Sequence, residues 1–233
     1  MKNDFFCNNW KLTLNWIKIY RMLFESTKPV NIPLKDGSIF YDPCFFDNKE
    51  ADHYFEVLRN DIKWQQDDIK IFGKTYAQPR LTALYANNDK PYRYSNLTMH
   101  PTKFSTELLE IKSKVEKYAL LDFTSCLLNL YRDGQDSNGW HADNEKELGK
   151  DPVIASVSFG ADRLFNMKHR QDKFHKLKLK LANGSLLIMR GSTQHHWLHQ
   201  IPKTKKKNWG AHQPNISKHK IKNMYKNLKY DIH

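Results

Sequence analysis

Two closely spaced residues, His141 and Asp143, have side chains suited to metal chemistry, and a histidine cluster follows later in the chain. Residues i and i+2 of a strand point to the same side, so this pair could reach one ion from a single extended segment. A later strand would add a third ligand from among His195, His196 and His199. Two histidines and one carboxylate on one face of an ion leave the opposite positions open, as in non-haem Fe(II) sites. The spacing therefore predicts a non-haem iron site.

The elements that would position these residues follow from the hydrophobic periodicity. Asp47 and Glu50 have the spacing of a helix capping box, and apolar residues repeat at helical spacing from Ala51 to Leu58. A second helix is expected over residues 106–121, and strands are expected over residues 123–131, 153–159 and 176–189. Two early helices followed by an antiparallel run of strands predict an α+β domain built on a sandwich or open barrel.

The dipeptide Asn183-Gly184 lies inside the last of these strand segments. Both residue types tolerate the positive φ angles that two-residue turns need. Before the dipeptide, Leu177, Leu179 and Leu181 alternate with lysines, as expected for a half-buried strand. We therefore expect a β-hairpin turn at Asn183-Gly184.

Composition bounds the class of protein. The chain has 233 residues, of which 39% are hydrophobic, enough for one sizeable core and therefore one domain with extensions. Three widely spaced cysteines, Cys7, Cys44 and Cys126, indicate thiols in a reducing compartment. Apolar runs stay far below the roughly 18 residues that span a bilayer. We expect a cytoplasmic monomer with no membrane contact, or a nuclear one if the source is eukaryotic.

The chain is strongly basic, with 38 lysines and arginines, 25 acidic residues and a net charge of +13. Such an excess favours a polyanionic partner, because phosphates attract lysine and arginine. Residues 201–233 contain nine lysines and a single acidic residue, Asp231, so much of the excess belongs to the tail. A solvated or disordered charged end explains the tail as well as a nucleic-acid contact does.

Five sequence stretches together carry a specific resemblance to a known family. They are Asn129-Leu-Tyr-Arg-Asp-Gly, Trp140-His-Ala-Asp143 with Glu145 and Glu147-Leu-Gly149, Ile154-Ala-Ser-Val-Ser-Phe-Gly160, Gly184-Ser-Leu-Leu-Ile-Met189, and Trp197-Leu-His-Gln-Ile-Pro-Lys203. With order and spacing preserved from about Pro33 to Lys203, the chain resembles the AlkB family. Members are Fe(II)- and 2-oxoglutarate-dependent dioxygenases that remove alkyl groups from nucleic-acid bases. The resemblance implies a double-stranded β-helix, or jelly-roll, core with supporting N-terminal helices.

The same resemblance implies a set of catalytic residues. The metal ligands would be His141, Asp143 and His199, the last because it precedes Gln-Ile-Pro-Lys as the family's distal histidine does. Residue types alone do not choose among the three histidines, and His195 and His196 stay unassigned. His195 would share a strand face with His199. The implied co-substrates are 2-oxoglutarate and O2.

Asn129 and Tyr131, at i and i+2, match family positions that hydrogen-bond 2-oxoglutarate. The alternative is a buried strand pair that satisfies backbone groups. Arg163 could contact substrate or pair with a surface acid, and Glu145 could face the pocket or belong to a solvated loop.

Base recognition would use a further set of residues. An alkylated base inside a duplex must be flipped out, and an apolar wedge with a stacking pocket can offset that cost. Ile71-Phe72-Gly73-Lys74 resembles the family's flipping hairpin with Phe72 as its finger, and Arg80 follows it. Tyr92 and Tyr94 match the aromatic stretch that lines the base pocket. Ordinary core packing is the alternative for these aromatic residues.

The chain departs from the family pattern after Lys203. Members carry a strand of the form R-x-N-x-T-x-R whose arginines bind the far carboxylate of 2-oxoglutarate. Here the corresponding stretch is residues 214–221, and no arginine occurs after Arg190. Lys218 or Lys220 could supply a point charge, but lysine does not reproduce the two-pronged guanidinium contact. A divergent active enzyme, an inactive relative and a reading-frame change in the gene each explain this ending.

The expected organisation is an N-terminal extension over residues 1–30, a dioxygenase domain over 31–213 and a basic tail over 214–233 that replaces the arginine-rich strand. The resemblance implies oxidative dealkylation of N-alkylated bases in DNA or RNA with Fe(II), 2-oxoglutarate and O2, releasing succinate, CO2 and formaldehyde. The alternative is an impaired or non-catalytic relative that binds nucleic acid without turnover.

Overall fold

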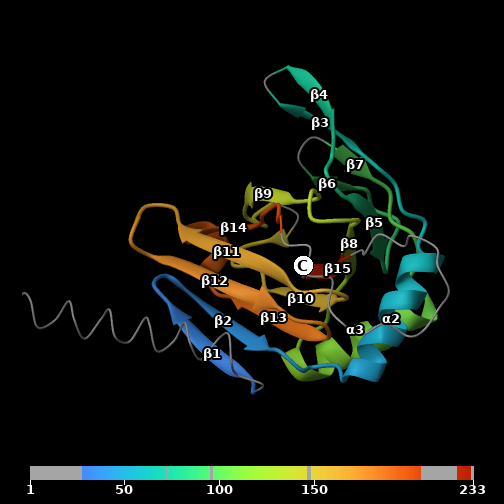
Figure 1. Ribbon diagram of the computed structural model, residues 1–233, viewed down its shortest axis with the longest axis horizontal. Helices are drawn as coiled ribbons and strands as arrows, with labels where there is room; N and C mark the ends of the chain where they lie inside the picture. The colour runs from blue at the N-terminus through green and yellow to red at the C-terminus, as the bar shows by residue number, and fades with distance from the viewer. Residues whose placement is uncertain (1–27, 72, 95–96, 146–147, 206–224, 232–233) are drawn as a thin grey trace, which may run out of the picture.

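The computed structural model describes residues 28–71, 73–94, 97–145, 148–205 and 225–231 (Figure 1). Two antiparallel sheets form the body of the protein. The major sheet has seven strands in the order β1 (Val30–Leu34), β2 (Gly37–Asp42), β13 (Ser185–Arg190), β10 (Ile154–Phe159), β15 (Tyr225–Asp231), β8 (Ser125–Tyr131) and β5 (Leu81–Ala86). The minor sheet has four strands in the order β12 (Lys176–Leu181), β11 (Arg163–His169), β14 (Trp197–Ile201) and β9 (Asn138–His141). This two-sheet arrangement confirms the predicted jelly-roll core.

Two small hairpins stand beside the body. One pairs β3 (Asp68–Ile71) with β4 (Lys74–Ala77), and the other pairs β6 (Tyr92–Tyr94) with β7 (Leu97–Met99). The β3–β4 hairpin projects away from the sheets at the top of Figure 1. It is the hairpin predicted to carry the flipping finger.

Apolar side chains gather in two clusters, one on each face of the major sheet. The cluster between the sheets includes Leu127 and Tyr131 of β8 with Met167, Leu179 and Trp197 of the minor sheet. The second cluster lies on the opposite face, where α2 (Asn48–Asp61) and α3 (Thr106–Ala119) cover the major sheet. One face of the major sheet is therefore covered by helices, and the other faces the minor sheet.

Both predicted helices are present with the predicted signals. Asp47 is the N-cap of α2, and its side chain accepts from the Glu50 N–H while the Glu50 carboxylate accepts from the Asp47 N–H. This reciprocal pair satisfies two donors that a helix start leaves open. In α3 the buried residues are Leu108, Ile111, Val115 and Ala119, the apolar stripe expected from the sequence. Both helices are thus local consequences of sequence.

The turn at Asn183-Gly184 is present, but the expected β-hairpin is wrong. In the described structure β12 pairs with β11 in the minor sheet, whereas β13 pairs with β10 and β2 in the major sheet. The turn therefore carries the chain from one sheet to the other. Gly184 has φ +75°, and a Cβ there would lie 2.5 Å from the Phe46 carbonyl oxygen, so glycine is required by both backbone angle and space.

The C-terminal strand differs from the sequence expectation. Residues 214–221, expected to replace the arginine-rich strand, lie outside the described residues. A strand nevertheless forms at Tyr225–Asp231 and lies between β10 and β8, with Asn227 opposite Ser158 on one side and Asn129 on the other. A strand therefore forms within residues 214–233, the region expected from sequence to be a basic tail. The sheet continues past residue 213, the expected end of the domain.

Within the described ranges no helix is both long enough and apolar enough to cross a membrane. Cys44 is exposed and Cys126 is buried, neither is in a disulfide bond within the described residues, and Cys7 lies outside them.

Candidate metal centre

Three side chains meet between the ends of β9 and β14. His141 Nε2 lies 3.8 Å from Asp143 Oδ1, and His199 Nε2 lies 3.4 Å from Asp143 Oδ2. The two imidazole ring centroids are 4.2 Å apart. The backbone register accounts for this meeting, because His199 of β14 is directly opposite His141 of β9. Asp143 and His199 are buried at 3% and 2% exposure, so water has little access to the two groups.

Hydrogen bonding fixes the tautomer of His141. Its Nδ1 lies 2.7 Å from the Gly139 carbonyl oxygen, which can only accept, so Nδ1 carries the proton. Nε2 is then the unprotonated nitrogen and faces Asp143. A carbonyl that accepts a hydrogen bond from Nδ1–H in this way is the usual support of a metal-binding histidine.

Asp143 does not lie on the strand that carries His141. The strand β9 ends at His141, so Asp143 lies in the segment that follows the strand. The backbone N–H of Asp143 donates to Gln194 Oε1 at 2.9 Å. Gln194 is completely buried, and its amide nitrogen contacts Met189 Sδ at 3.4 Å. A buried glutamine therefore fixes the loop position of Asp143, and histidine-centred sequence reasoning missed it.

Gln194 is placed by the short helix α4 (Thr193–His196), which docks on β2. The Thr193 hydroxyl accepts from the Ser38 N–H at 3.1 Å and donates to the Arg190 carbonyl. The approach depends on Gly37, because a Cβ at that position would lie 2.6 Å from Thr193 Oγ1. The series of contacts from Gly37 through Thr193 to Gln194 thus links the major sheet to the Asp143 loop.

The pair predicted to bind 2-oxoglutarate lies in the same inter-sheet space. Leu127 and Tyr131 of β8 belong to the inter-sheet cluster, and Asn129 between them shares their face. The Asn129 side-chain oxygen accepts from Arg80 Nε at 2.8 Å. Arg80 is only 4% exposed, so it braces Asn129 from within the protein. The structure shows Arg80 in contact with Asn129, and its expected substrate contact stays a prediction.

Arg163 is buried and donates hydrogen bonds to backbone carbonyls, and its expected substrate contact stays a prediction. It is 4% exposed and donates to the backbone carbonyls of Asp133 at 3.3 Å, Asp136 at 2.7 Å and Pro202 at 2.7 Å. Its guanidinium also lies 5.3 Å from the centre of the Tyr131 ring. Arg163 therefore joins the β8–β9 loop to the end of β14.

A second arginine stiffens the same β8–β9 loop. Arg132 Nε donates to Asp136 Oδ2 at 2.8 Å, and Arg132 Nη2 donates to Asp136 Oδ1 at 3.0 Å. This hydrogen-bonded pair raises the pKa of Arg132. The loop that leads into β9, and so to His141, is held by charge-assisted contacts.

The remaining predicted substrate residues are placed less fully. Phe72, which lies between β3 and β4 in the sequence, is outside the described residues. The backbones of Tyr92 and Tyr94 form β6, and their side chains lie outside the described part of the chain. Glu145 is half-buried, and its carbonyl accepts from the Leu148 N–H at 3.0 Å. It does not belong to the three-residue cluster.

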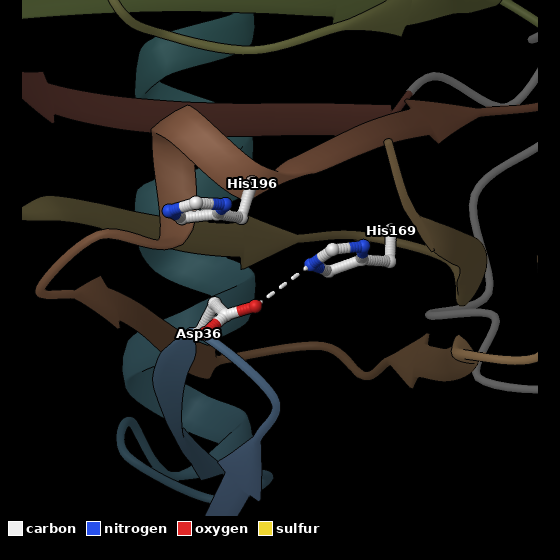
Figure 2. A group of neighbouring side chains, drawn as sticks. All are labelled: Asp36, His169 and His196. Carbon is white, nitrogen blue, oxygen red and sulfur yellow. Dashed lines mark hydrogen bonds and ion pairs between the residues drawn. The ribbon is translucent and has the colours of Figure 1, made fainter. Parts of the chain in front are cut away.

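The other two histidines of the cluster lie elsewhere. His195 belongs to α4 and not to the strand of His199, contrary to the expected shared face, and its Nε2 lies 3.1 Å from Asp151 Oδ1. His196 lies beside His169 and Asp36 in a second group of possible metal ligands (Figure 2). The choice of His199 over its neighbours therefore agrees with the geometry.

The second group has the wrong tautomer for a metal. His169 Nδ1 lies 3.3 Å from the Gln171 backbone nitrogen and 3.0 Å from that of Asp172. Backbone N–H groups only donate, so the proton of a neutral His169 is on Nε2, which contacts Asp36 Oδ2 at 3.2 Å (Figure 2). Metal binding at Nε2 would leave an imidazolate ring without either proton. We therefore interpret this group as a brace between the β1–β2 turn and β11.

By the same criteria the first group suits Fe(II). It offers two imidazoles and one carboxylate, the donor set of the facial triad. Ligand atoms that each lie about 2.1 Å from one ion are at most about 4.2 Å apart. The separations of 3.8 and 3.4 Å satisfy that limit.

Comparisons with known proteins agree with this centre. Residues 38–227 match the family model described as 2OG-Fe(II) oxygenase superfamily. The chain is 43% identical over 175 residues to alpha-ketoglutarate-dependent dioxygenase alkB homolog 3 of Bos taurus, covering 69% of this chain and 59% of the relative. It is 35% identical over 171 residues to DNA oxidative demethylase ALKBH2 of Homo sapiens, covering 69% of this chain and 66% of the relative.

The aligned regions span about three fifths of the length of the alkB homolog 3 proteins that the chain matches. Among solved structures, the structure of OsALKBH1 superposes with a TM-score of 0.59 at 15% identity, covering 88% of this chain and all of that chain. At that identity the superposition supports the fold alone. Family model, relatives and fold agree, and the chain belongs to the 2OG-Fe(II) oxygenase superfamily, among its AlkB-like members.

Proposed function

We propose that the protein removes alkyl groups oxidatively from N-alkylated bases of DNA or RNA, using Fe(II), 2-oxoglutarate and O2. The observation that carries this proposal is the convergence of His141, Asp143 and His199, with Asn129 and Tyr131 on the inter-sheet face of β8. Relatives that bear the names of a 2-oxoglutarate-dependent dioxygenase and a DNA oxidative demethylase support it. The products are succinate, CO2 and, from a methyl group, formaldehyde.

Each residue of the centre has a definite task in this proposal. His141, Asp143 and His199 hold Fe(II) from one side, which leaves the opposite positions open for 2-oxoglutarate and O2. Bound Fe(II) supplies the oxidising chemistry that hydroxylates the alkyl carbon. Asn129 and Tyr131 orient 2-oxoglutarate by hydrogen bonds, and Arg80 fixes the Asn129 amide through its 2.8 Å contact. The inter-sheet space keeps bulk water away from the reacting groups.

A second candidate function is nucleic-acid binding without turnover. It is favoured by the absence of arginine after Arg190, the part of the sequence in which the family carries its carboxylate anchors. Losing a charge-assisted anchor of about 1.5 to 3 kcal/mol weakens co-substrate affinity by about one to two decades. An active enzyme of this kind needs a higher 2-oxoglutarate concentration than its relatives.

The test is an assay of the purified protein with Fe(II), ascorbate, millimolar 2-oxoglutarate and an oligonucleotide that contains 1-methyladenine. We expect succinate and formaldehyde in equal amounts, with single- and double-stranded DNA and RNA compared in parallel. Iron binding without any succinate or formaldehyde would reject the enzyme and leave the binding protein.

The net charge of +13 supports a polyanionic substrate.

We also propose that the protein acts as a monomer in the cytoplasm. Size-exclusion chromatography with light scattering at several concentrations tests the monomer, and a dimer mass throughout the series would reject it.

Replacing the buried Gln194 tests how the centre is held together. Gln194→Met keeps the side-chain volume but removes the acceptor of the Asp143 N–H. Because such supporting contacts typically change metal affinity by about 10- to 100-fold, we expect Co(II) or Fe(II) titrations to show a loss of that size. His195→Ala, an exposed change on the same short helix, serves as the matched control. Equal metal affinity of wild type and Gln194→Met, at similar melting temperatures, would contradict this role.

A further inference from the structure

The segment from Arg170 to His175, which we call the Phe174 loop, joins β11 to β12 at the left margin of the body in Figure 1. Phe174 is 95% exposed, the most exposed of the large hydrophobic side chains that the structure describes. Burying such a ring stabilises a fold by roughly 1.5 to 3 kcal/mol, and this loop forgoes that gain. An aromatic ring displayed in this way calls for a partner.

The loop has a fixed shape. The Asp172 carboxylate accepts from the Phe174 N–H at 3.0 Å, and His169 Nδ1 accepts from the backbone N–H groups of Gln171 and Asp172. At the base of the loop, the backbone N–H of His169 donates to the His175 carbonyl at 2.9 Å. These contacts restrain the backbone on both sides of Phe174 and thereby hold its side chain in solvent.

Contacts from outside the loop reinforce this shape. Lys35 Nζ lies 2.9 Å from Asp172 Oδ2, and the hydrogen bond from Lys35 lowers the pKa of Asp172 to about 2. His175 Nδ1 lies 2.9 Å from the same carboxylate oxygen. The brace of Asp36, His169 and His196 supports the adjoining end of β11 (Figure 2). The Asp172 carboxylate therefore stays ionised at neutral pH and is engaged by its neighbours.

The cations around the loop remain available. A surface pocket beside it is lined by Lys168, His169, Arg170, Lys173, Lys176 and Leu198, a set that includes four cations and no acid. Arg170, Lys173 and Lys176 are exposed, and they form no ion pair within the described part of the chain. Because its one acid, Asp172, is engaged, the loop presents a net positive surface.

This surface lies on the face of the minor sheet opposite the candidate metal centre. Leu198 of the pocket precedes the ligand His199 on β14, and it faces the opposite side of the minor sheet. Lys168 Nζ lies 4.3 Å from the ring centre of Trp140, a 41% exposed residue that precedes the ligand His141 on β9. Cations and exposed aromatic rings thus continue from the loop to the strand that carries a metal ligand.

We infer that the Phe174 loop, with Lys168 and Lys176, is a second nucleic-acid contact that binds the strand beyond the alkylated base. The lysines and Arg170 contact phosphates, and Phe174 stacks on an unpaired base of the same strand. This inference rests on the proposed function, since it assigns a surface to the same substrate.

The chemistry of the surface fits nucleic acid better than a lipid headgroup layer. Exposed rings interleaved with lysine and arginine bind strands through stacking and phosphate contacts, and stacking tolerates any base. Membrane-surface binding instead needs a broad apolar face that enters the headgroup region. In the loop itself Phe174 is the one large apolar side chain.

The charge contacts are tested by fluorescence anisotropy with a single-stranded 20-mer that carries one 1-methyladenine, measured from 50 to 300 mM salt. For the variant Arg170→Gln/Lys173→Gln/Lys176→Gln we expect weaker binding at low salt. Each phosphate contact contributes about 0.7 to the salt slope of single strands, so the slope should fall by about 2. The control variant Lys49→Gln/Lys63→Gln/Lys117→Gln changes three exposed lysines outside this surface and should leave the slope unchanged.

The stacking contact is tested by Phe174→Ala. We expect about 5- to 150-fold weaker binding, the equivalent of 1 to 3 kcal/mol of stacking, with an unchanged salt slope. Since Phe174 is 95% exposed, its removal should not lower the melting temperature. Wild-type affinity and slope in both loop variants would overturn the inference. Vesicles that contain phosphatidylserine test the membrane alternative. If the loop variants lost binding to these vesicles but bound the oligonucleotide as the wild type does, the inference would be overturned as well.

A trinucleotide substrate separates this inference from the proposed function. Such a substrate has almost no strand beyond the alkylated base for the loop to bind, so we expect the loop variants to turn it over at the wild-type rate. Loop-dependent binding by a wild-type protein that releases no formaldehyde would reject the enzyme and keep the loop. Wild-type turnover with loop-independent binding of the 20-mer would reject the loop and keep the enzyme.

Discussion

Asp143→Ala is expected to abolish formaldehyde and succinate release. Asp143 is the carboxylate that lies within 3.8 Å of both candidate histidine ligands, and without it the two imidazoles hold the metal alone. Changes to supporting contacts around a metal cost about 10- to 100-fold, so removing a ligand should cost more than about three decades in turnover. Succinate and formaldehyde assays with saturating iron measure this loss.

The matched control is Asp151→Ala. Asp151 is also an aspartate paired with a histidine, His195, but it lies outside the three-residue cluster. We expect this variant to keep wild-type turnover. Salt-dependent oligonucleotide binding should persist in both variants, because phosphate contacts do not involve the metal. Turnover by Asp143→Ala above one tenth of the wild-type rate would exclude Asp143 as a ligand.

The parts of the fold that sequence predicted well are those fixed by local rules. The capping box of Asp47 and Glu50 and the apolar stripe of α3 depend on residues within one or two helical turns. Alternation along β12 likewise placed Leu177, Leu179 and Leu181 in the core. Such patterns describe one element, and they hold whatever its neighbours are.

The errors in the fold concern pairing partners. Asn183-Gly184 has the chemistry of a hairpin turn, yet β12 and β13 lie in different sheets. A turn dipeptide sets the backbone angles of two residues, whereas sheet membership depends on what else packs against each strand. β15 was missed for a related reason, because its residues lack the alternation that identifies a strand, and its pairing with β10 and β8 is long-range.

The candidate site shows the same division. His141, Asp143 and His199 could be named from motif order, and the register of β9 with β14 brings them together. Gln194 could not be named in this way, because no sequence pattern distinguishes a glutamine beside two histidines. Its role is visible only in its contact with the Asp143 N–H. Arg80 and Arg163 were expected near substrate, but arginines can be buried when carbonyl and amide acceptors meet their donors. Sequence gives no direct measure of such burial.

Gly184→Ala is expected to be the most destabilising of the conservative changes considered. The substitution adds a methyl group 2.5 Å from the Phe46 carbonyl oxygen and 3.1 Å from Ala51 Cβ, at a residue whose φ is +75°. The Phe46 backbone has little freedom to withdraw, because its N–H donates to the Gly184 carbonyl at 2.9 Å. Positive φ costs an alanine about 1 to 2 kcal/mol, and the overpacking adds about 1 to 3 kcal/mol. The free energy of unfolding in urea should therefore fall by about 2 to 5 kcal/mol.

Gly73→Ala separates the two causes of that loss. Gly73 has φ +77°, within 2° of Gly184, but a Cβ there meets nothing within 4 Å. The Gly73→Ala variant should lose only the free energy that positive φ costs an alanine. Its unfolded chain is stiffer than that of the wild type, which offsets this loss by about 0.4 to 1 kcal/mol. The difference between the two variants then measures how rigidly the turn between the sheets is pressed against Phe46. Equal losses would mean that Phe46 and the start of α2 yield freely to the new methyl group. In that case the Gly184 turn would tolerate substitution, and its glycine would be required for backbone angle alone.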